Sequence, residues 1–382
     1  MTPEEKILIL LSNYFLSVEH LSSLTELLAQ NPDWAKLIAP IRFHSLSPLI
    51  VKHISENNLQ NNLPSSSWDK TLGFARTQTV RRLKLIAVFQ ELSAIFKENN
   101  IEFILLKGLY LSDNFYSNPT LRPMQDIDIL VKEETLSRVI TILESSGATR
   151  LVELQSEYIN SLLQHIPPFI YKDVMLEVHT NIVAANLPYS FTPDLLWSNI
   201  SNHQIQKTNT LVFNPELNLV YLCIHLFRHL RTAKFKLIWF TDILQFLSKT
   251  TSLDYAVLKS LAAETRSDEA IGQIFFFLQN FWNQKTIADF PIPIIEPDER
   301  ILRNFQNGLL RGQNPDEFSN FEAWKQIPGI FNKLRYLSGI AFPSSAYMKK
   351  KYSLSSSLLL IPIYPFNALK VCFKGVKLLI SR

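Results

Sequence analysis

Residues 122–131 decide how this chain is interpreted, and they read Arg-Pro-Met-Gln-Asp-Ile-Asp-Ile-Leu-Val. The second half alternates acidic and branched apolar residues, a pattern that predicts a β-strand. Side chains two apart on a strand point to the same face, so Asp126 and Asp128 hold two carboxylates about 6 to 7 Å apart along the chain. Neighbouring anions repel, and burial beside Ile127 and Ile129 is costly unless a cation neutralises them.

A divalent cation explains this pair of acids. Carboxylate oxygens suit Mg²⁺ or Mn²⁺, and Mg²⁺ usually bridges to substrate phosphates. Two such ions, about 4 Å apart, can polarise a phosphate and stabilise a leaving pyrophosphate. The pair alone also fits an ordinary surface strand, so a third acid on a neighbouring strand is wanted. Glu177 is our candidate; Asp173 competes with it but lies in a predicted turn, and His179 need not approach the metals.

The surrounding sequence predicts a small mixed sheet with helices on it. Gly108 follows the first predicted strand where the chain must turn, and Gly147 stands where a left-handed residue ends a helix. A Lys172-Asp173 turn joins two strands in a hairpin. The predicted strands are 101–106, 126–131, 169–171 and 174–179, and the predicted helices between them are 109–116 and 133–145.

Helical patterns lie on both sides of this sheet. Apolar residues recur at spacings of three and four before residue 98, interrupted by a predicted loop at 63–67, and again in 217–231 and 237–248. We therefore predict an α+β protein in three parts: a helical region 1–98, a sheet-containing core 99–200 and a helical region 201–382 with a basic tail.

Three stretches together resemble the family catalogued as uncharacterised nucleotidyltransferases, in the DNA polymerase beta-like superfamily. They are Leu-Leu-Lys-Gly at 105–108, the stretch 122–131 and Leu-Glu-Val-His at 176–179. The resemblance extends from Arg-Phe-His-Ser-Leu-Ser-Pro-Leu at 42–49 to Phe-Pro-Ser-Ser at 342–345. Only the central motifs are specific.

The resemblance implies a minimal nucleotidyltransferase sheet and a role for each matching residue. Asp126 and Asp128 match the superfamily's metal-binding pair, and Glu177 matches its third acid. Lys107 and Gly108 occupy the turn that holds the nucleotide triphosphate through backbone amides, and a helix start after Gly108 independently favours anions. Lys107 and Arg122 add positive charge against the phosphates. The chain departs from the superfamily by having one glycine in this turn and a long gap to Asp126.

These features predict transfer of a nucleoside monophosphate from an NTP to an acceptor that the sequence does not identify, with release of pyrophosphate and Mg²⁺ or Mn²⁺ as cofactor. Asp126 and Asp128 are expected to bind the metals, and Glu177 to complete the site and orient the acceptor or act as its base. The catalytic cleft is expected between the sheet and the helical regions. The alternative is a non-catalytic module of the same fold that binds a nucleotide or a protein partner.

Charge and composition bear on partners and location. Ten cations and no acid follow Glu322, whereas the preceding residues hold 28 cations against 34 acids, so a tail of +10 is attached to a body of −6. The basic helix predicted at 366–380 suggests docking on the protein, or peripheral contact with an anionic membrane. No nucleic-acid module is recognisable. Two distant cysteines and no apolar run long enough for a membrane span predict a cytoplasmic protein. A third hypothesis is a membrane-associated scaffold that works through the basic tail.

The N-terminus and one histidine pair complete these expectations. Thr2, Pro3 and Glu5 suit the cap, first and third positions of a helix rather than a secretory signal. His225 and His229 lie four apart on a predicted helix, with Asp242 on the next one. Because no glutamate lies between the histidines as in a metalloprotease helix, packing or substrate binding by the nearby Arg228, Arg231 and Lys234 is the favoured interpretation.

Overall fold

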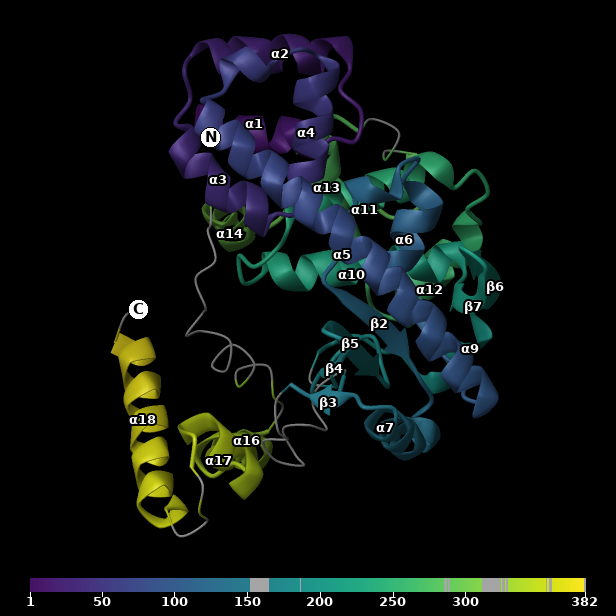
Figure 1. Ribbon diagram of the computed structural model, residues 1–382, viewed down its shortest axis with the longest axis vertical. Coiled ribbons are helices and arrows are strands. Elements are labelled where there is room, and N and C mark those ends of the chain that lie inside the picture. The colour runs from purple at the N-terminus through teal and green to yellow at the C-terminus, as the bar shows by residue number, and fades with distance from the viewer. Residues whose placement is uncertain are drawn as a thin grey trace. The chain divides into compact units, whose positions relative to one another are not determined.

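The computed structural model in Figure 1 describes residues 1–151, 165–185, 187–284, 287, 289–310, 324, 327, 329–354, 356 and 359–380, with side chains to residue 371. The chain forms two compact units. The first comprises Met1–Glu98, Ile104–Ile127 and Asp194–Pro315, and the second comprises Asn99–Phe103, Asp128–Pro193 and Asp316–Arg382.

The first unit begins with short helices followed by one long helix. The short ones are α1 (Pro3–Ser12), α2 (Val18–Ala29), α3 (Trp34–Phe43) and α4 (Ser47–Glu56), and a 3₁₀ turn (η1, Gln60–Asn62) precedes α5 (Ser65–Glu98). The predicted capping box is confirmed, because Thr2 Oγ1 accepts from the Glu5 amide and the Thr2 amide donates to Glu5. The predicted loop at 63–67 was wrong in its second half, where serines after Pro64 form the first turn of α5.

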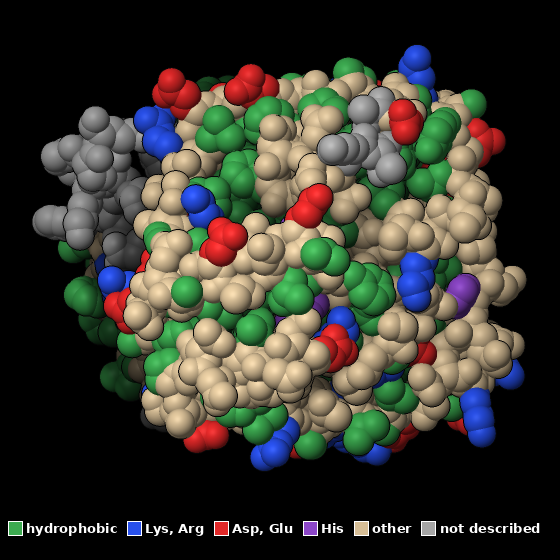
Figure 2. Space-filling model, turned by 90° about the horizontal axis from the view of Figure 1, so that it is seen from above, with side chains coloured by type: hydrophobic (Ala, Val, Ile, Leu, Met, Phe, Trp, Pro, Cys, Tyr) green, Lys and Arg blue, Asp and Glu red, His purple; other side chains and the backbone are tan. Residues whose placement is uncertain are grey.

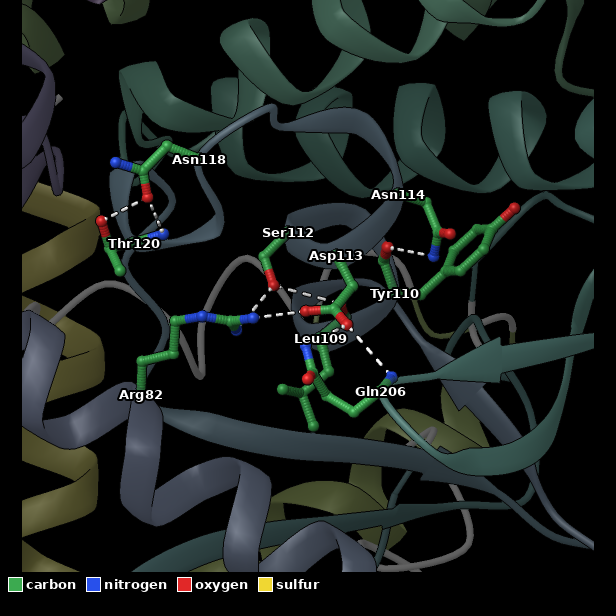
Figure 3. Close-up of polar contacts among 9 residues, drawn as sticks. All are labelled: Arg82, Leu109, Tyr110, Ser112, Asp113, Asn114, Asn118, Thr120 and Gln206. Carbon is green, nitrogen blue, oxygen red and sulfur yellow. Dashed lines mark hydrogen bonds and ion pairs between the residues drawn. The ribbon is translucent and has the colours of Figure 1, made fainter.

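Helix α5 is 34 residues long and is tied to the next helix, α6 (Gly108–Phe115), by a buried ion pair. Figure 3 shows Arg82 pointing at Ser112 and Asp113, and Arg82 Nη1 donates to Ser112 Oγ at 3.1 Å. Asp113 also accepts from the side chain of Gln206 at 2.9 Å. These bonds fix α5, α6 and the turn at Gln206 relative to one another.

The first unit also holds three neighbouring strands, in the order β1 (Ile104–Leu106), β7 (Thr208–Phe213), β6 (Ile200–Ile205). Strand β1 runs parallel to β7, and β6 and β7 form an antiparallel hairpin whose turn places Gln206 at a φ of 55°. We did not predict this hairpin, because β6 is mostly polar, Ile-Ser-Asn-His-Gln-Ile, and gives little apolar alternation.

Further helices follow the hairpin in the first unit. They are α9 (Pro193–Ser198, just before the hairpin), α10 (Pro215–Leu230), α11 (Leu237–Lys249), α12 (Tyr255–Glu264), α13 (Asp268–Trp282) and α14 (Glu299–Leu309). Helices α10 and α11 confirm the predicted helices 217–231 and 237–248. Their core is aromatic, with Phe240 stacked on Trp282 at 4.3 Å between ring centroids.

The described part of the second unit contains four strands in the order β3 (Thr149–Arg150), β4 (Phe169–Tyr171), β5 (Val174–His179), β2 (Asp126–Leu130), the last of which starts in the first unit. The predicted hairpin is confirmed: Lys172 and Asp173 both have positive φ in the turn between β4 and β5. A 3₁₀ turn (η3, Glu133–Thr135) and α7 (Leu136–Ser145) follow β2, and Gly147 has the predicted positive φ of 92°.

The second unit ends in α16 (Ile330–Ala341), α17 (Ser345–Tyr352) and α18 (Leu360–Ile380). The predicted basic helix lies within α18, but the side chains of Lys374 and Lys377 lie outside the described residues. Contact of this tail with a membrane therefore stays a prediction. Within the described part of the chain, no helix has the length and apolarity needed to cross a bilayer.

The predicted α+β fold class is confirmed by the mixture of helices and seven short strands that the described residues form. Figure 2 shows cationic and anionic side chains interspersed on one face, with hydrophobic side chains between them. The three-part division of the chain stays a prediction.

Candidate functional site

Three chemically reactive side chains converge in the second unit. Asp128 on β2 and His179 on β5 are almost fully buried, and Glu177 on β5 is partly buried. His179 Nε2 lies 3.0 Å from Asp128 Oδ1 and 3.6 Å from Glu177 Oε2. The three side chains each place a possible ligand atom within 4.8 Å of the others, and the two carboxylates are donors that can hold a divalent cation.

The hydrogen bond between His179 and Asp128 has a defined direction. An ionised carboxylate only accepts, so His179 Nε2 carries the proton and donates to Asp128 Oδ1. The His179 ring also packs on His165, with 5.1 Å between ring centroids, and its carbonyl accepts from the Val131 amide at 2.9 Å. His179 is thus fixed by both its backbone and its ring, and it holds the Asp128 carboxylate in one orientation.

We did not predict this position of His179 from the sequence. We expected that the histidine need not approach the metals, but residues 177 and 179 are two apart on β5 and so share a face. The same strand period that was applied to Asp126 and Asp128 would have found it. Asp173, the competing acid, lies in the β4–β5 turn as predicted.

Asp126 begins β2 and is only partly buried. It is not one of the three residues whose ligand atoms cluster within 4.8 Å. Its negative charge acts instead on two cations of the first unit, Arg122 and Lys236. Burial lowers the pKa of the Lys236 ammonium, and the carboxylate of Asp126 partly opposes that effect. Sequence reasoning did not single out Lys236.

The predicted phosphate turn has an unusual backbone at Lys107. Its φ of 43° and ψ of −109° lie outside the regions that side chains other than glycine prefer, so the turn stores strain at the N-cap of α6. Gly108 follows, and a Cβ built there would lie 3.2 Å from Arg122 Nη1 and 3.7 Å from Met124 Cβ. Glycine therefore lets the Arg122 guanidinium approach the start of the helix.

Arg122 is held by Asp242 rather than exposed to a ligand. Its Nε and Nη2 donate to the two Asp242 oxygens at 3.1 and 2.8 Å, and Tyr116 donates to Asp242 Oδ1 at 2.7 Å. Burial opposes the positive form of Arg122, but the charge and hydrogen bonds of Asp242 outweigh it and raise the pKa of Arg122. Contact of Arg122 with a phosphate stays a prediction.

Aromatic and imidazole rings of α10 and α11 form a cluster beside Lys107. The rings of His225, His229 and Trp239 lie 4.5 to 4.8 Å apart. Lys107 Nζ lies 5.4 Å from the centre of the Tyr221 ring, and Lys236 Nζ lies 5.8 Å from that of Trp239. Among the described residues, His225, His229 and Asp242 do not form a group of possible metal ligands.

The electrostatics of this ring cluster are positive. The pKa of His229 is lowered to about 3, first by burial and then by the charges of Arg228, Lys107, Lys236 and Lys234. The pKa of His225 is lowered well below its usual value, first by burial and then by Lys107 and other neighbours. Both imidazoles are therefore neutral at pH 7, and most of the charges that depress their pKa values are those of lysines and arginines.

Comparison with known proteins identifies the family. The model of a family described as uncharacterised nucleotidyltransferase matches residues 30–283. The chain belongs to this family. The nucleotidyltransferase also has a likeness, at 15% identity, to the crystal structure of ANT(2″)-Ia in complex with adenylyl-2″-tobramycin, covering 48% of this chain and 98% of that one at a TM-score of 0.36.

The solution structure of the antibiotic-resistance factor ANT(2″)-Ia gives a similar result. Its identity is again 15%, and it covers 48% of this nucleotidyltransferase and 92% of its own chain at a TM-score of 0.34. The comparison with curated proteins gives no match. Membership of the family supports the transfer of a nucleoside monophosphate, and all of the residues predicted for the site lie within the matched range.

Proposed function

We propose that this nucleotidyltransferase transfers a nucleoside monophosphate from an NTP to an acceptor, depends on a divalent cation and releases pyrophosphate. The observation that carries the proposal is the convergence of Asp128, Glu177 and His179, two carboxylates and an imidazole, from two neighbouring strands. Burial of such a group is costly without a cation, which supports a metal site.

The residues present fit Mg²⁺ or Mn²⁺. Asp126, Asp128 and Glu177 would supply carboxylate oxygens, which both ions accept. His179 would hold Asp128 through the 3.0 Å hydrogen bond and so position a ligand atom. A bound cation would offset the negative charge that develops around the α-phosphate.

In the proposed reaction an acceptor oxygen attacks the α-phosphorus of the NTP. The new P–O bond forms as the bond from that phosphorus to the bridging oxygen of the β-phosphate breaks, and pyrophosphate leaves with the electron pair. Glu177, the partly buried acid, would orient the acceptor hydroxyl or take its proton.

The triphosphate would be held at the start of α6. The amides at the start of α6 after Lys107 and Gly108 favour anions, and the Lys107 and Lys236 side chains add charge. Lysines beside neutral imidazoles and a tryptophan ring suit a polyphosphate that carries a base. Side chains would here supply what a second glycine supplies in the wider superfamily.

A second candidate function is nucleotide binding without turnover. The observation that favours it is that Arg122, which we predicted to contact a phosphate, instead forms an internal ion pair with Asp242. Calorimetry with NTPs, combined with a pyrophosphate-release assay, separates the two candidates, because a binding module takes up NTP and releases no pyrophosphate.

The proposal is tested by incubating the protein with labelled NTPs and a cell extract, and finding by mass spectrometry the species that gains a nucleotide. Asp128→Asn and Glu177→Gln are expected to abolish that species while the protein stays folded. Glu133→Gln, just beyond β2, is the control and is expected to behave as wild type. Undiminished labelling by Asp128→Asn would refute the proposed chemistry.

A further inference from the structure

A small cavity of about 150 Å³ lies within the first unit, beside the segment that leads into β2. The proposed function does not use it. Three parts of the chain line it: the turn between α3 and α4, the middle of α5, and the residues just before Asp126. The lining residues are Arg42, Ser45, Ser47, Pro48, Phe74, Thr77, Gln78, Arg81, Pro123 and Gln125.

Two arginines give this cavity its charge. Arg42 lies over the Phe74 ring at 5.2 Å, and among the described residues neither Arg42 nor Arg81 forms an ion pair with a carboxylate. The contrast with the next residue is direct, because Figure 3 shows Arg82 engaged by Asp113. Consecutive arginines on α5 thus differ: Arg82 is buried in an ion pair, whereas Arg81 is exposed and lines the cavity.

Polar groups complete the lining. The Oε1 atom of Gln78 is buried and has no hydrogen-bond partner among the described residues. Ser47 is the first residue of α4, whose N-cap Leu46 makes no side-chain capping bond, so the positive end of this helix adjoins the cavity. A ligand there can accept hydrogen bonds from the guanidinium groups, and a protonated phosphate oxygen or a hydroxyl of the ligand can donate one to Gln78 Oε1.

The turn between Arg42, at the end of α3, and Ser47, the first residue of α4, is held in place by His44. His44 is fully buried; its Nδ1 accepts from the Leu237 amide at 3.2 Å, so its Nε2 donates to the Leu309 carbonyl at 2.8 Å. Burial lowers the pKa of His44 to about 4, which keeps the imidazole in this neutral form. Ser45 follows with a φ of 61°. The stretch 42–49, whose role the sequence left open, therefore builds one wall of a preformed cavity.

The volume of the cavity and its place in the chain limit the class of ligand that it can bind. Sites for drug-sized molecules occupy roughly 300 to 1,000 Å³, so a whole nucleotide does not fit. A single tetrahedral anion does, and Gln125 on the cavity wall directly precedes Asp126. We propose that this cavity binds a phosphate group of the acceptor, so that the acceptor is a phosphate ester bearing the attacking hydroxyl. This assignment of the acceptor rests on the proposed function.

Binding of inorganic phosphate, measured by calorimetry on the full chain at constant ionic strength without divalent cations, tests the site. Arg42→Gln and Arg81→Gln are each expected to weaken phosphate binding about tenfold or more, because a charge-assisted hydrogen bond is lost. Arg76→Gln is the matched control: it is exposed on the same helix, outside the cavity, and should bind phosphate as wild type. Thermal melting checks that all variants are folded.

Three results would overturn the assignment. Unchanged phosphate binding in Arg42→Gln and Arg81→Gln would show that phosphate does not bind in this cavity. Equal weakening in Arg76→Gln would show that binding depends on general surface charge. A parallel loss of NTP binding in Arg81→Gln, measured with Mg²⁺ present, would assign the cavity to the nucleotide. Asp128→Asn is expected to bind phosphate as wild type does. The phosphate-binding test can therefore fail or succeed independently of the proposed metal chemistry.

Discussion

The ion pair between Arg122 and Asp242 gives the sharpest prediction about stability. Both side chains are nearly buried, at 7% and 2% exposure, and two hydrogen bonds of 3.1 and 2.8 Å join them. Asp242→Asn keeps the shape of the side chain but removes the negative charge, which leaves a buried guanidinium uncompensated. Removing one partner of such a pair costs about 3 to 5 kcal/mol, a large part of the roughly 5 to 15 kcal/mol that stabilises a folded domain.

The loss is measured by urea unfolding at pH 7, followed by circular dichroism. Glu102→Gln is the control, because its pair with Lys132 is exposed at 67% and 37% and contributes at most about 1 kcal/mol. Replacing both buried partners, as in Arg122→Met with Asp242→Leu, should recover much of the loss. If Asp242→Asn costs no more than Glu102→Gln, the pair is solvated and our account of Arg122 as a brace of the Gly108 turn is wrong.

Three further predictions concern the site and its supports. Gly108→Ala should weaken NTP binding several-fold in calorimetry, because its Cβ would meet a guanidinium nitrogen at 3.2 Å, whereas Gly73→Ala meets no atom within 4 Å and should leave binding unchanged. Lys236→Met should weaken NTP binding about tenfold and Lys249→Met, exposed on the same helix, should not; equal effects would exclude a specific contact. Burial lowers the pKa of His53 to about 4, so the neutral imidazole stabilises the fold fully above pH 6.5, and this stabilisation is lost as the pH falls toward 4. Between pH 7 and pH 5, the free energy of unfolding measured in urea should therefore fall by about 2 kcal/mol less in His53→Gln than in wild type. Equal losses in the two proteins would contradict this.

Local patterns in the sequence were sufficient for much of the second unit. Alternation in Asp-Ile-Asp-Ile predicted β2, and the paired apolar runs around Lys172 and Asp173 predicted the β4–β5 hairpin. Each of these patterns depends on a few neighbouring residues, so it predicts local structure whichever distant residues pack against that segment. The polar strand β6 carries no such signal, because its place depends on pairing with β7 rather than on its own side chains.

The candidate site divides in the same way. Strand period placed Glu177 on β5, and applying it once more would have found His179 beside Asp128. The pairing of Arg122 with Asp242 joins residues 120 positions apart, and no spacing in the sequence predicts which cation meets which acid. Long-range partners of this kind had to come from the structure.

The central claim is that acids from two strands hold one divalent cation, and Mn²⁺ binding followed by electron paramagnetic resonance tests it most directly. The wild-type protein is expected to bind Mn²⁺, and Asp128→Asn and Glu177→Gln to bind it at least about tenfold more weakly, with His179→Gln weakened less because glutamine retains a hydrogen-bond donor. Wild-type Mn²⁺ affinity in both acid variants would contradict the account.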